Sequence, residues 1–387
     1  MWRKESGALL RRKFCYNALT MEAKNIGALP LQAIRELILQ KHILGADDKH
    51  AQPASLDLTL SDEVYRVDGL FLPKTGERVR DAILKVNPIA FAENSIFEVG
   101  VPYLARLNEK LKLPADVYAY SNPKSSTGRN DVKVSLIVDG ISRFDSAGAR
   151  GYSGELWAFI EPKSFRIKLP KNEALLQLRF FNDDTRVKEE ELRNIYEKDA
   201  LLFRKNGDML AFDELKISDR DGGLILTVDF GEEIIGWRAK NGAAILDFAK
   251  RAYYNATDFF EPVSRPVRDF LFLQKGNFYI FYTREYVRVP ANLACEMAPV
   301  DIKNGEFRSH YAGFIDPGWG GKTGLPLVLE VRPFDDNILV SHGQPICKLV
   351  FERMAETPDR LYGEGSGSHY TLQRGPVLSK HFKKHDF

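Results

Sequence analysis

The chain has 387 residues, 44% of them hydrophobic and 28% charged, which predicts an ordinary globular protein of two domains. The 55 basic and 53 acidic residues give a net charge of +2, which argues against a nucleic-acid duplex as partner. No apolar run approaches the roughly 20 residues that a membrane span requires. The three cysteines are scattered, so a disulfide framework or a cysteine-rich zinc site is not expected and a reducing cytoplasm fits.

The elements expected along the chain are mainly short strands. Residues 31–44 carry apolar side chains at helical spacing and predict a helix. From 51 to 181, short apolar runs are separated by Pro, Gly, Asn and Asp, as in an all-β fold. A second helix is expected at about 187–202, and strands resume from 224 to 354. The last thirty residues are rich in Gly and Ser and then become basic.

The strand-rich parts repeat each other. Residues 101–117 match 277–293 at an offset of 290 − 114 = 176, and a later block matches at 316 − 145 = 171. Upstream, PASLDL at 53–58 is set against AAILDF at 243–248. The matched pairs include Tyr103 with Tyr279, Glu109 with Glu285, Pro114 with Pro290, Asp145 with Asp316 and Pro162 with Pro333. The sequence therefore predicts two copies of one all-β unit.

Five parts of the chain follow from this repeat. They are an N-terminal extension and helix (1–45), a first repeat (46–185), a helical junction (186–222), a second repeat (223–356) and a Gly-rich tail (357–387). Residues 1–20 are basic and weakly resemble a transit peptide, or precede a true start at Met21. No function is assigned to them.

One carboxylate stands in an apolar run of the second repeat. Residues 311–332 begin as a turn-rich loop and end in a strand, where alternation puts Val328 and Glu330 on one face and Leu327 and Leu329 on the other. A glutamate on an apolar face is either paired, at a solvated edge, or tuned for proton transfer.

The two repeats have lost opposite halves of a polar set. The first repeat has KSSTGR at 124–129, whereas the second has DIKNG at 301–305. Conversely, Glu330 of the second repeat corresponds to Phe159 of the first. A single site assembled from both repeats explains this complementary loss.

These residues resemble a known family. PASLDL, NPKSSTGR, IDPGWGG followed by LVLEV, and the tail LYG with GSHYTLQ are similar to dCTP deaminases of the dUTPase-like superfamily, in their long duplicated form. The resemblance runs from about residue 29 to 382. It implies an all-β fold with a few helices, built as two tandem distorted β-barrels (β-clip repeats). It also implies zinc-free hydrolytic deamination of dCTP to dUTP and ammonia, which supplies pyrimidine deoxynucleotide synthesis.

The resemblance also assigns site residues. It makes Glu330 the catalytic general base and acid, with Ser125 and Arg129 orienting water and stabilising charge. The chain departs from the single-copy enzymes at two positions. At Phe314 those enzymes have an arginine, and the counterpart of that arginine here is Arg143 of the first repeat. At His369 they have a lysine. The substrate-binding residues are then Lys124, Ser126, Thr127, Gly128, Asp316, Val328, Leu329, Tyr362, His369, Tyr370 and Gln373.

The chemistry suits these residue types. Deamination adds water at C4, protonates N3 and expels ammonia, and one carboxylate can move both protons if desolvation raises its pKa toward neutrality. Mg²⁺ would be held through the triphosphate rather than by the protein. The tail could close as a lid, or be a disordered terminus, and 380–385 is expected to be a solvated end. The SSTG segment could also be a plain turn, and Arg129 a surface ion pair.

Three functions stay open on the sequence. They are dCTP deaminase, a dUTP diphosphatase or bifunctional deaminase–diphosphatase that uses Asp316 to activate water, and a nucleotide-binding regulator without catalysis. The expected partner is dCTP, with no nucleic acid or membrane, in a cytoplasmic homo-oligomer (dimer or trimer). Whether the site is completed within one chain or between chains is not decided by the sequence.

Overall fold

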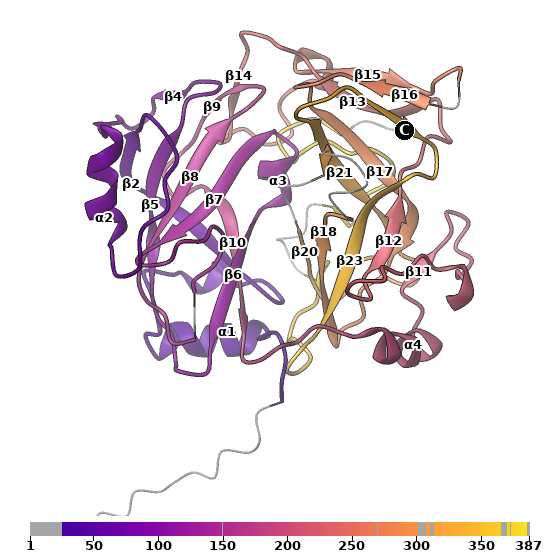
Figure 1. Ribbon diagram of the computed structural model, residues 1–387, viewed down its shortest axis with the longest axis horizontal. Helices are drawn as coiled ribbons and strands as arrows, with labels where there is room; N and C mark the ends of the chain where they lie inside the picture. The colour runs from indigo at the N-terminus through magenta and orange to yellow at the C-terminus, as the bar shows by residue number, and fades with distance from the viewer. Residues whose placement is uncertain are drawn as a thin grey trace, which may run out of the picture.

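The computed structural model describes residues 25–148, 150–268, 270–300, 307–309, 313–364, 370–371 and 373–384. The described residues form two β-rich halves side by side, the first in indigo to magenta and the second in rose through orange to yellow (Figure 1). The N-terminal segment 1–20 and His369 lie outside these residues. In the described part, none of the helices is both long and apolar enough to span a bilayer.

The helices are short and the strands are many. The helices are α1 (Leu31–Leu39), α2 (Val79–Ala82), α3 (Ser125–Gly128) and α4 (Glu189–Lys198), with 3₁₀ turns η1 (Asp48–His50), η2 (Ile83–Val86), η3 (Phe212–Glu214) and η4 (Ala256–Asp258). The first half contains β1 (Ile43–Leu44), β2 (Leu56–Arg66), β3 (Ile89–Ala90), β4 (Ile96–Phe97), β5 (Tyr103–Lys112), β6 (Tyr118–Pro123), β7 (Val132–Val138), β8 (Ser153–Pro162), β9 (Arg166–Lys168) and β10 (Ala174–Phe181). The second half contains β11 (Leu202–Phe203), β12 (Leu224–Thr227), β13 (Ile234–Ala239), β14 (Ile245–Asp247), β15 (Phe260–Ser264), β16 (Phe270–Leu273), β17 (Tyr279–Val287), β18 (Leu293–Ala298), β19 (Phe307–Ser309), β20 (Phe314–Ile315), β21 (Leu325–Pro333), β22 (Ile338–Ser341) and β23 (Pro345–Arg353).

Both predicted helices are present but shorter than expected. The first ends at Leu39, because Lys41 adopts a positive φ of 62° and Ile43–Leu44 then pairs with β5 as a strand. The second ends at Lys198, and Leu202–Phe203 pairs with β17.

Equivalent hydrogen bonds show that the two halves share one architecture. Glu109 accepts hydrogen bonds from the backbone N–H and the hydroxyl of Thr59 at 2.9 and 2.7 Å. Glu285 accepts the same pair from Thr227 at 2.8 and 2.6 Å. The hydroxyls of Tyr103 and Tyr279 each accept from a backbone N–H five residues earlier. The repeat predicted at offset 176 is therefore confirmed.

One part of the predicted alignment is wrong. Leu56 of β2 pairs with Leu178 in the first half. In the second half, the equivalent of Leu178 is Leu349, and Leu349 pairs with Leu224 of β12. PASLDL therefore corresponds to the segment leading into β12, not to AAILDF. Residues 245–247 of the latter form β14, which adds in parallel to β9 of the first half. PASLDL and AAILDF share the pair Leu-Asp and both lead into apolar strands, so they match in sequence without being equivalent in the fold.

The hydrophobic cores of the halves interpenetrate. The first core is built from residues 29–180, but also contains Phe259 and Phe260 of the second half and Leu378 and Phe382 of the tail. The second core runs from Val187 to Tyr370. Because apolar burial stabilises both halves through shared side chains, the seam between them is fixed.

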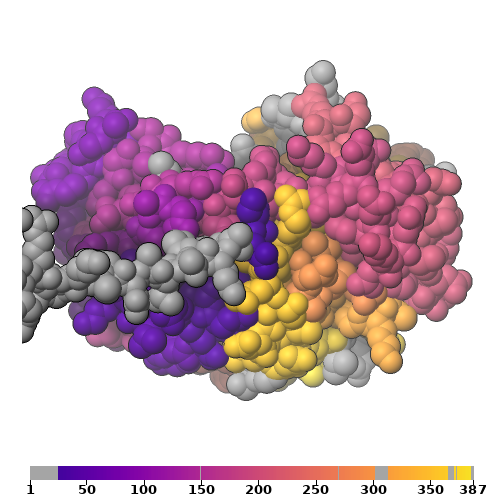
Figure 2. Space-filling view, turned by 90° about the horizontal axis from the view of Figure 1, so that it is seen from below, coloured from indigo at the N-terminus to yellow at the C-terminus, as the bar shows by residue number. Residues whose placement is uncertain are grey.

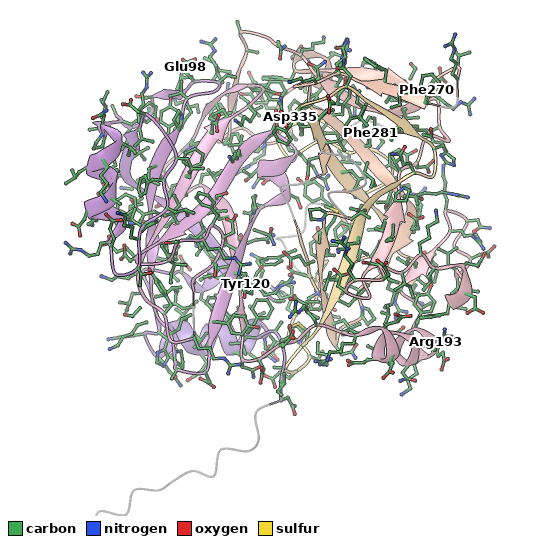
Figure 3. The ribbon with its side chains drawn as sticks, viewed as in Figure 1. Glu98, Tyr120, Arg193, Phe270, Phe281 and Asp335 are labelled. Carbon is green, nitrogen blue, oxygen red and sulfur yellow. The ribbon has the colours of Figure 1, made fainter. Side chains whose placement is uncertain are left out.

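The seam has its own small apolar cluster. Ala28, Phe181 and Met354 belong to it, and Tyr120 packs against it and lies toward the seam in Figure 3. In Figure 2 the described N-terminal residues, in indigo, lie beside the yellow C-terminal segment, in agreement with the bridge between Ala28 and Met354. A Cβ added to Gly27 would lie 1.9 Å from the backbone N of Ala355, so only glycine permits this approach.

Candidate functional site

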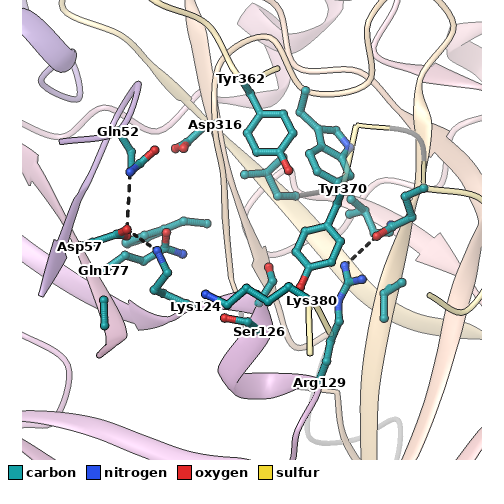
Figure 4. Close-up of a pocket in the computed structure, with 18 of the residues that line it drawn as sticks. Gln52, Asp57, Lys124, Ser126, Arg129, Gln177, Asp316, Tyr362, Tyr370 and Lys380 are labelled. Carbon is teal, nitrogen blue, oxygen red and sulfur yellow. Dashed lines mark hydrogen bonds and ion pairs between the residues drawn. The ribbon is translucent and has the colours of Figure 1, made fainter. Parts of the chain in front are cut away.

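A cavity of about 370 Å³ opens at the seam and is lined by both halves of one chain and by the tail. Figure 4 shows Gln52, Asp57 and Asp316 on one side, and Tyr362, Tyr370 and Arg129 on the other. The first half contributes Gln52, Asp57, Lys124, Ser125, Ser126, Arg129, Asn172, Glu173, Ala174 and Gln177. The rest of the chain contributes Arg251, Met297, Phe314, Ile315, Asp316, Trp319, Leu327, Val328, Glu330, Tyr362, Tyr370, Gln373 and Lys380.

The SSTGR segment forms a single helical turn at the edge of the cavity. Strand β6 ends at Pro123, Lys124 is extended, and its carbonyl accepts from the N–H groups of Thr127 and Gly128. Figure 1 shows α3 at the boundary between the halves, facing β21. This turn brings Ser125 and Ser126 to the cavity wall, and Ser126 is buried.

Arg129 is a buried cation held by the tail. Its Nη1 donates to the carbonyl of Val377 at 2.9 Å, and its Nη2 donates to Oε1 of Gln373 at 2.7 Å. The guanidinium lies 3.9 Å from the ring centroid of Tyr370, a cation–π contact. Its buried Nε has no hydrogen-bond partner among the described residues. The expectation that Arg129 could be a surface ion pair is therefore wrong.

Glu330 is buried on β21, opposite Ile280 of β17, with 2% of its surface exposed. Alternation along β21 is as predicted. Val328 belongs to the first core, and Leu329 and Val331 belong to the second. Val328 and Glu330 both line the cavity. A buried carboxyl group thus faces a cavity that Arg129 and the serines of α3 also line.

Further charged groups gather near Lys124. Lys124 forms an ion pair with Asp57, whose Oδ2 also lies 3.5 Å from Nε2 of Gln52. Glu173 accepts two hydrogen bonds from Arg251 at 3.0 and 3.1 Å, and lies 3.7 Å from the ammonium of Lys380. Burial lowers the pKa of Lys380 to about 8, against the opposing attraction of Glu173. Three cations are therefore concentrated at this part of the cavity.

The expectation of a solvated end at 380–385 is wrong for its first three residues. Lys380 lines the cavity, His381 is fully buried, and Phe382 packs against the rings of Phe259 and Phe260. Nδ1 of His381 lies 3.0 Å from both Nδ2 of Asn130 and Oγ of Ser379. Residues 378–382 form a docked segment, because Leu378 and Phe382 pack in the first core on either side of Lys380.

The segment before β21 places Asp316 and the aromatic side chains of Phe314 and Trp319 at the cavity. Oδ1 of Asp316 accepts from Nη2 of Arg179 at 3.2 Å. Burial raises the pKa of Asp316, and the Arg179 cation opposes that shift. Trp319 packs against Tyr362 of the tail, with ring centroids 5.0 Å apart, so the tail covers this loop.

Most of the predicted site residues that the structure describes meet at this cavity, but three of them do not line it. The hydroxyl of Thr127 donates to the carbonyl of Leu175 at 3.1 Å, Gly128 lies within the turn, and Leu329 is in the second core. Arg143 lies over the ring of Tyr120, 5.4 Å from its centroid, and does not line the cavity either.

Sequence reasoning missed several charged lining residues. Asp57 is the acid of the PASLDL motif, and alternation of a buried strand could have marked it. Glu173, Arg251 and Lys380 come from three separate loops, so no local pattern connects them. In the described part of the chain, no group of three or more His, Cys, Asp or Glu side chains has a geometry that could hold a metal ion.

Comparisons with known proteins agree with this architecture. The family described as 2′-deoxycytidine 5′-triphosphate deaminase N-terminal domain matches residues 25–184, and the corresponding C-terminal domain matches 188–382. A crystal structure of 2′-deoxycytidine 5′-triphosphate deaminase from Agrobacterium tumefaciens superposes with a TM-score of 0.77 at 37% identity, over 87% of this chain and 100% of that one.

Shorter relatives match part of the chain. Proteins named "dCTP deaminase, dUMP-forming" from Beutenbergia cavernae and Halobacterium salinarum are each 34% identical over 118 residues, which is 29% of this chain. The match spans 59% and 57% of the length of these relatives.

The fold consists of two tandem dUTPase-like β repeats that share one polar cavity. The chain belongs to the 2′-deoxycytidine 5′-triphosphate deaminase family.

Proposed function

We propose that this chain hydrolyses dCTP to dUTP and ammonia, with Glu330 as general base and then general acid. The observation that carries the proposal is the burial of Glu330, at 2% exposure, on the wall of a cavity that it shares with Arg129 and Ser125. Each repeat retains only one half of the set, and this cavity unites the two halves.

The cavity offers a role for each group. Glu330 takes one proton from water as the oxygen adds to C4 of cytosine and passes it to N3. It then takes the second proton from the C4 hydroxyl and gives it to the amino group, which leaves as ammonia. Ser125 orients the water, and the unpartnered Nε of Arg129 supplies a fixed positive charge where negative charge develops. General acid–base catalysis of this kind contributes about 10²–10⁴-fold in rate.

The phosphates are assigned to the cationic part of the cavity. Lys124, Arg251 and Lys380 supply three positive charges there, which suits a polyphosphate. Glu173 and Asp57 already pair with these cations, so Mg²⁺ is proposed to arrive coordinated to the phosphate oxygens. The proposed reaction uses no zinc.

The tail closes the cavity in this proposal. Gln373 and Val377 bind Arg129, and Tyr362 covers Trp319, so binding of the nucleotide would be coupled to docking of the tail. Both halves of one chain line the cavity. A homo-oligomer and a cytoplasmic location stay predictions.

A second candidate is formation of dUMP and pyrophosphate by the same chain. It is favoured by the printed names of the two shorter relatives, which are dUMP-forming. In that reaction, a second water would displace pyrophosphate from the α-phosphate of dUTP.

Product analysis separates these candidates. Purified full-length protein is incubated with dCTP, CTP or dCMP, and ammonia, dUTP, dUMP and pyrophosphate are quantified. Ammonia with an equal amount of dUTP supports the first candidate, and dUMP with pyrophosphate supports the second. Binding of dCTP without ammonia release would reject both and favour a nucleotide-binding regulator. EDTA followed by added Mg²⁺, compared with a zinc-selective chelator, tests the proposed metals.

A further inference from the structure

Arg179 is a fully buried cation that joins the two halves beneath the loop carrying Asp316. It lies on β10 of the first half, yet its guanidinium lies 4.1 Å from the ring centroid of Phe314 in the second half. Its Nη2 donates to Oδ1 of Asp316 at 3.2 Å and to the carbonyl of Ile315 at 3.3 Å. Arg179 therefore binds both the side chain and the backbone of that loop.

The other end of the guanidinium is anchored away from the cavity. Its Nη1 donates to Oε2 of Glu352 at 2.9 Å and to the carbonyl of Cys295 at 3.1 Å, and its Nε donates to the carbonyl of Ala54 at 3.3 Å. With all of its nitrogens engaged, the guanidinium has a single orientation. It does not line the cavity, so it acts on a ligand only through another group.

The repeat shows why the second half needs this cation. In the first half, the equivalent loop aspartate, Asp145, is held by Ser121 Oγ at 3.2 Å and by the N–H of Leu136 at 2.7 Å. Ser121 pairs with Leu178, and Met297 pairs with Leu349, which is the equivalent of Leu178 in the second half. Met297 is therefore the equivalent of Ser121. Methionine cannot donate a hydrogen bond to a carboxylate.

The second half thus lacks the hydroxyl that holds Asp145 in the first. Arg179 takes the place of this hydroxyl as the donor to Asp316. The residue of the second half that is equivalent to Arg179 is Val350, since Val350 pairs with Glu296 as Arg179 pairs with Tyr120. Among the described residues, Asp316 Oδ2 has no hydrogen-bond partner, and Asp316 lines the cavity.

We propose that Arg179 is a positioning residue of the site, which fixes the Asp316 carboxylate so that it accepts a hydrogen bond from an N–H or O–H group of the bound deoxynucleotide. This inference rests on the proposed function. Arg179 also keeps Asp316 an acceptor, since its positive charge favours the ionised carboxylate against the effect of burial.

The test begins with three single variants of the full chain, and the Arg179→Lys, Asp316→Asn double variant is added to them. Arg179→Lys retains the charge but cannot reproduce the forked geometry. Asp316→Asn removes the ionised acceptor. Glu352→Gln is the matched control, because Glu352 is buried and binds the same guanidinium but does not line the cavity. Kinetics of ammonia release, equilibrium binding of dCTP and thermal unfolding are measured for each variant.

Arg179→Lys and Asp316→Asn are each expected to raise KM and Kd for dCTP about tenfold, the effect of one hydrogen bond to a charged group. The double variant is expected to be no worse than either single variant, because both remove the same contact. Glu352→Gln is expected to lower thermal stability and leave KM unchanged. Multiplicative effects in the double variant, or an equal rise of KM in Glu352→Gln, would show that Arg179 only supports packing.

A pH profile adds a readout that packing alone would not move. Arg179→Met removes the charge, so the pKa of Asp316 rises further and dCTP binding is expected to be lost at a higher pH than in wild type. If this variant does not fold, Arg179→Lys with the double variant decides alone. If wild type binds dCTP but releases no ammonia, the proposed reaction fails, and the Kd values still test Arg179. Unchanged Kd values in folded Arg179→Lys overturn the inference.

Discussion

The guanidinium of Arg332 forms an ion pair with the carboxylate of Asp131 across the seam, with Nε 3.4 Å from Oδ1 and a closer contact from Nη2 to Oδ2. Asp131 follows Arg129 by two residues, and Arg332 follows Glu330 by two residues. Oγ of Ser164 also donates to Asp131, at 2.5 Å. This buried pair therefore fixes the turn that carries Arg129 against the strand that carries Glu330.

Removing one partner of this pair is expected to destabilise the protein strongly. Asp131 is fully buried and Arg332 is 9% exposed, so Asp131→Asn would leave a guanidinium without its charge partner. Breaking a buried pair in this way costs about 3–5 kcal/mol in the free energy of unfolding. Urea unfolding of Asp131→Asn measures this loss. Asp183→Asn, which breaks the half-exposed pair with Arg150, is the control and is expected to change the unfolding curve little.

The double replacement Asp131→Leu with Arg332→Met should lose less stability than the sum of the two single replacements, since no buried charge is left unpaired. Strict additivity, or a loss no larger than that of the Asp183 control, would contradict a structural role for the pair at the seam.

Glu330→Gln is expected to abolish ammonia release while leaving dCTP binding intact. The amide preserves the shape of the side chain but cannot accept a proton from water, so we expect kcat to fall by about 10²–10⁴-fold. Steady-state kinetics and calorimetric binding check the two parts. The control is Glu285→Gln, a partly buried glutamate that binds Thr227 and does not line the cavity. Substantial turnover by Glu330→Gln, or equal loss in the control, would remove Glu330 from the mechanism.

Lys380 should make dCTP affinity depend on pH near 8. Its pKa is lowered to about 8 by burial, so the side chain is an ammonium below that pH and a neutral amine above it. Because a phosphate binds the ammonium, affinity should weaken as pH rises, by about tenfold between pH 7 and pH 9. Calorimetry in the Glu330→Gln background measures binding without turnover.

Two variants isolate the contribution of Lys380. Lys380→Arg keeps its charge at both pH values and should lose this pH dependence, whereas Lys383→Met, at an exposed side chain that donates to Asn255, should retain it. An identical pH profile in Lys380→Arg and wild type would show that Lys380 does not bind the phosphates.

Local patterns in the sequence were sufficient for the repeat and for the strand that carries Glu330. Tyr103 with Tyr279 and Glu109 with Glu285 recur because each makes the same hydrogen bond in its own half. The alternation of Val328 and Glu330 against Leu329 follows directly from the strand geometry.

Contacts between distant segments were beyond the reach of the sequence. Arg179 lies in an apolar strand-like run, where nothing indicates that it reaches Asp316, 137 residues later. β14 pairs with β9 of the first half, and no local pattern in AAILDF indicates this pairing between halves. The basic tail looked solvated, because hydropathy does not show that Lys380 pairs with Glu173 or that His381 is enclosed.

Phe382 is an aromatic anchor of the tail in the first core. Phe382 is 4% exposed and its ring lies 5.5 Å from that of Phe260 and 5.6 Å from that of Phe259. Replacing a buried phenylalanine by alanine removes about 3–5 kcal/mol of packing. Because the tail enters the first core only through Leu378 and Phe382 among the described residues, we expect this loss to appear as local release of the tail rather than as global unfolding.

Release of the tail should weaken substrate binding through Arg129. Phe382→Ala would free Val377, whose carbonyl holds the Arg129 guanidinium, so KM for dCTP should rise while the global unfolding transition moves little. Trypsin should then cleave after Arg374 faster than in wild type. Phe382→Leu, which retains an apolar side chain, is the control and should stay protected. If Phe382→Ala resists trypsin as wild type does and binds dCTP equally well, the tail is held by other contacts, and the coupling between the aromatic anchor and Arg129 does not exist.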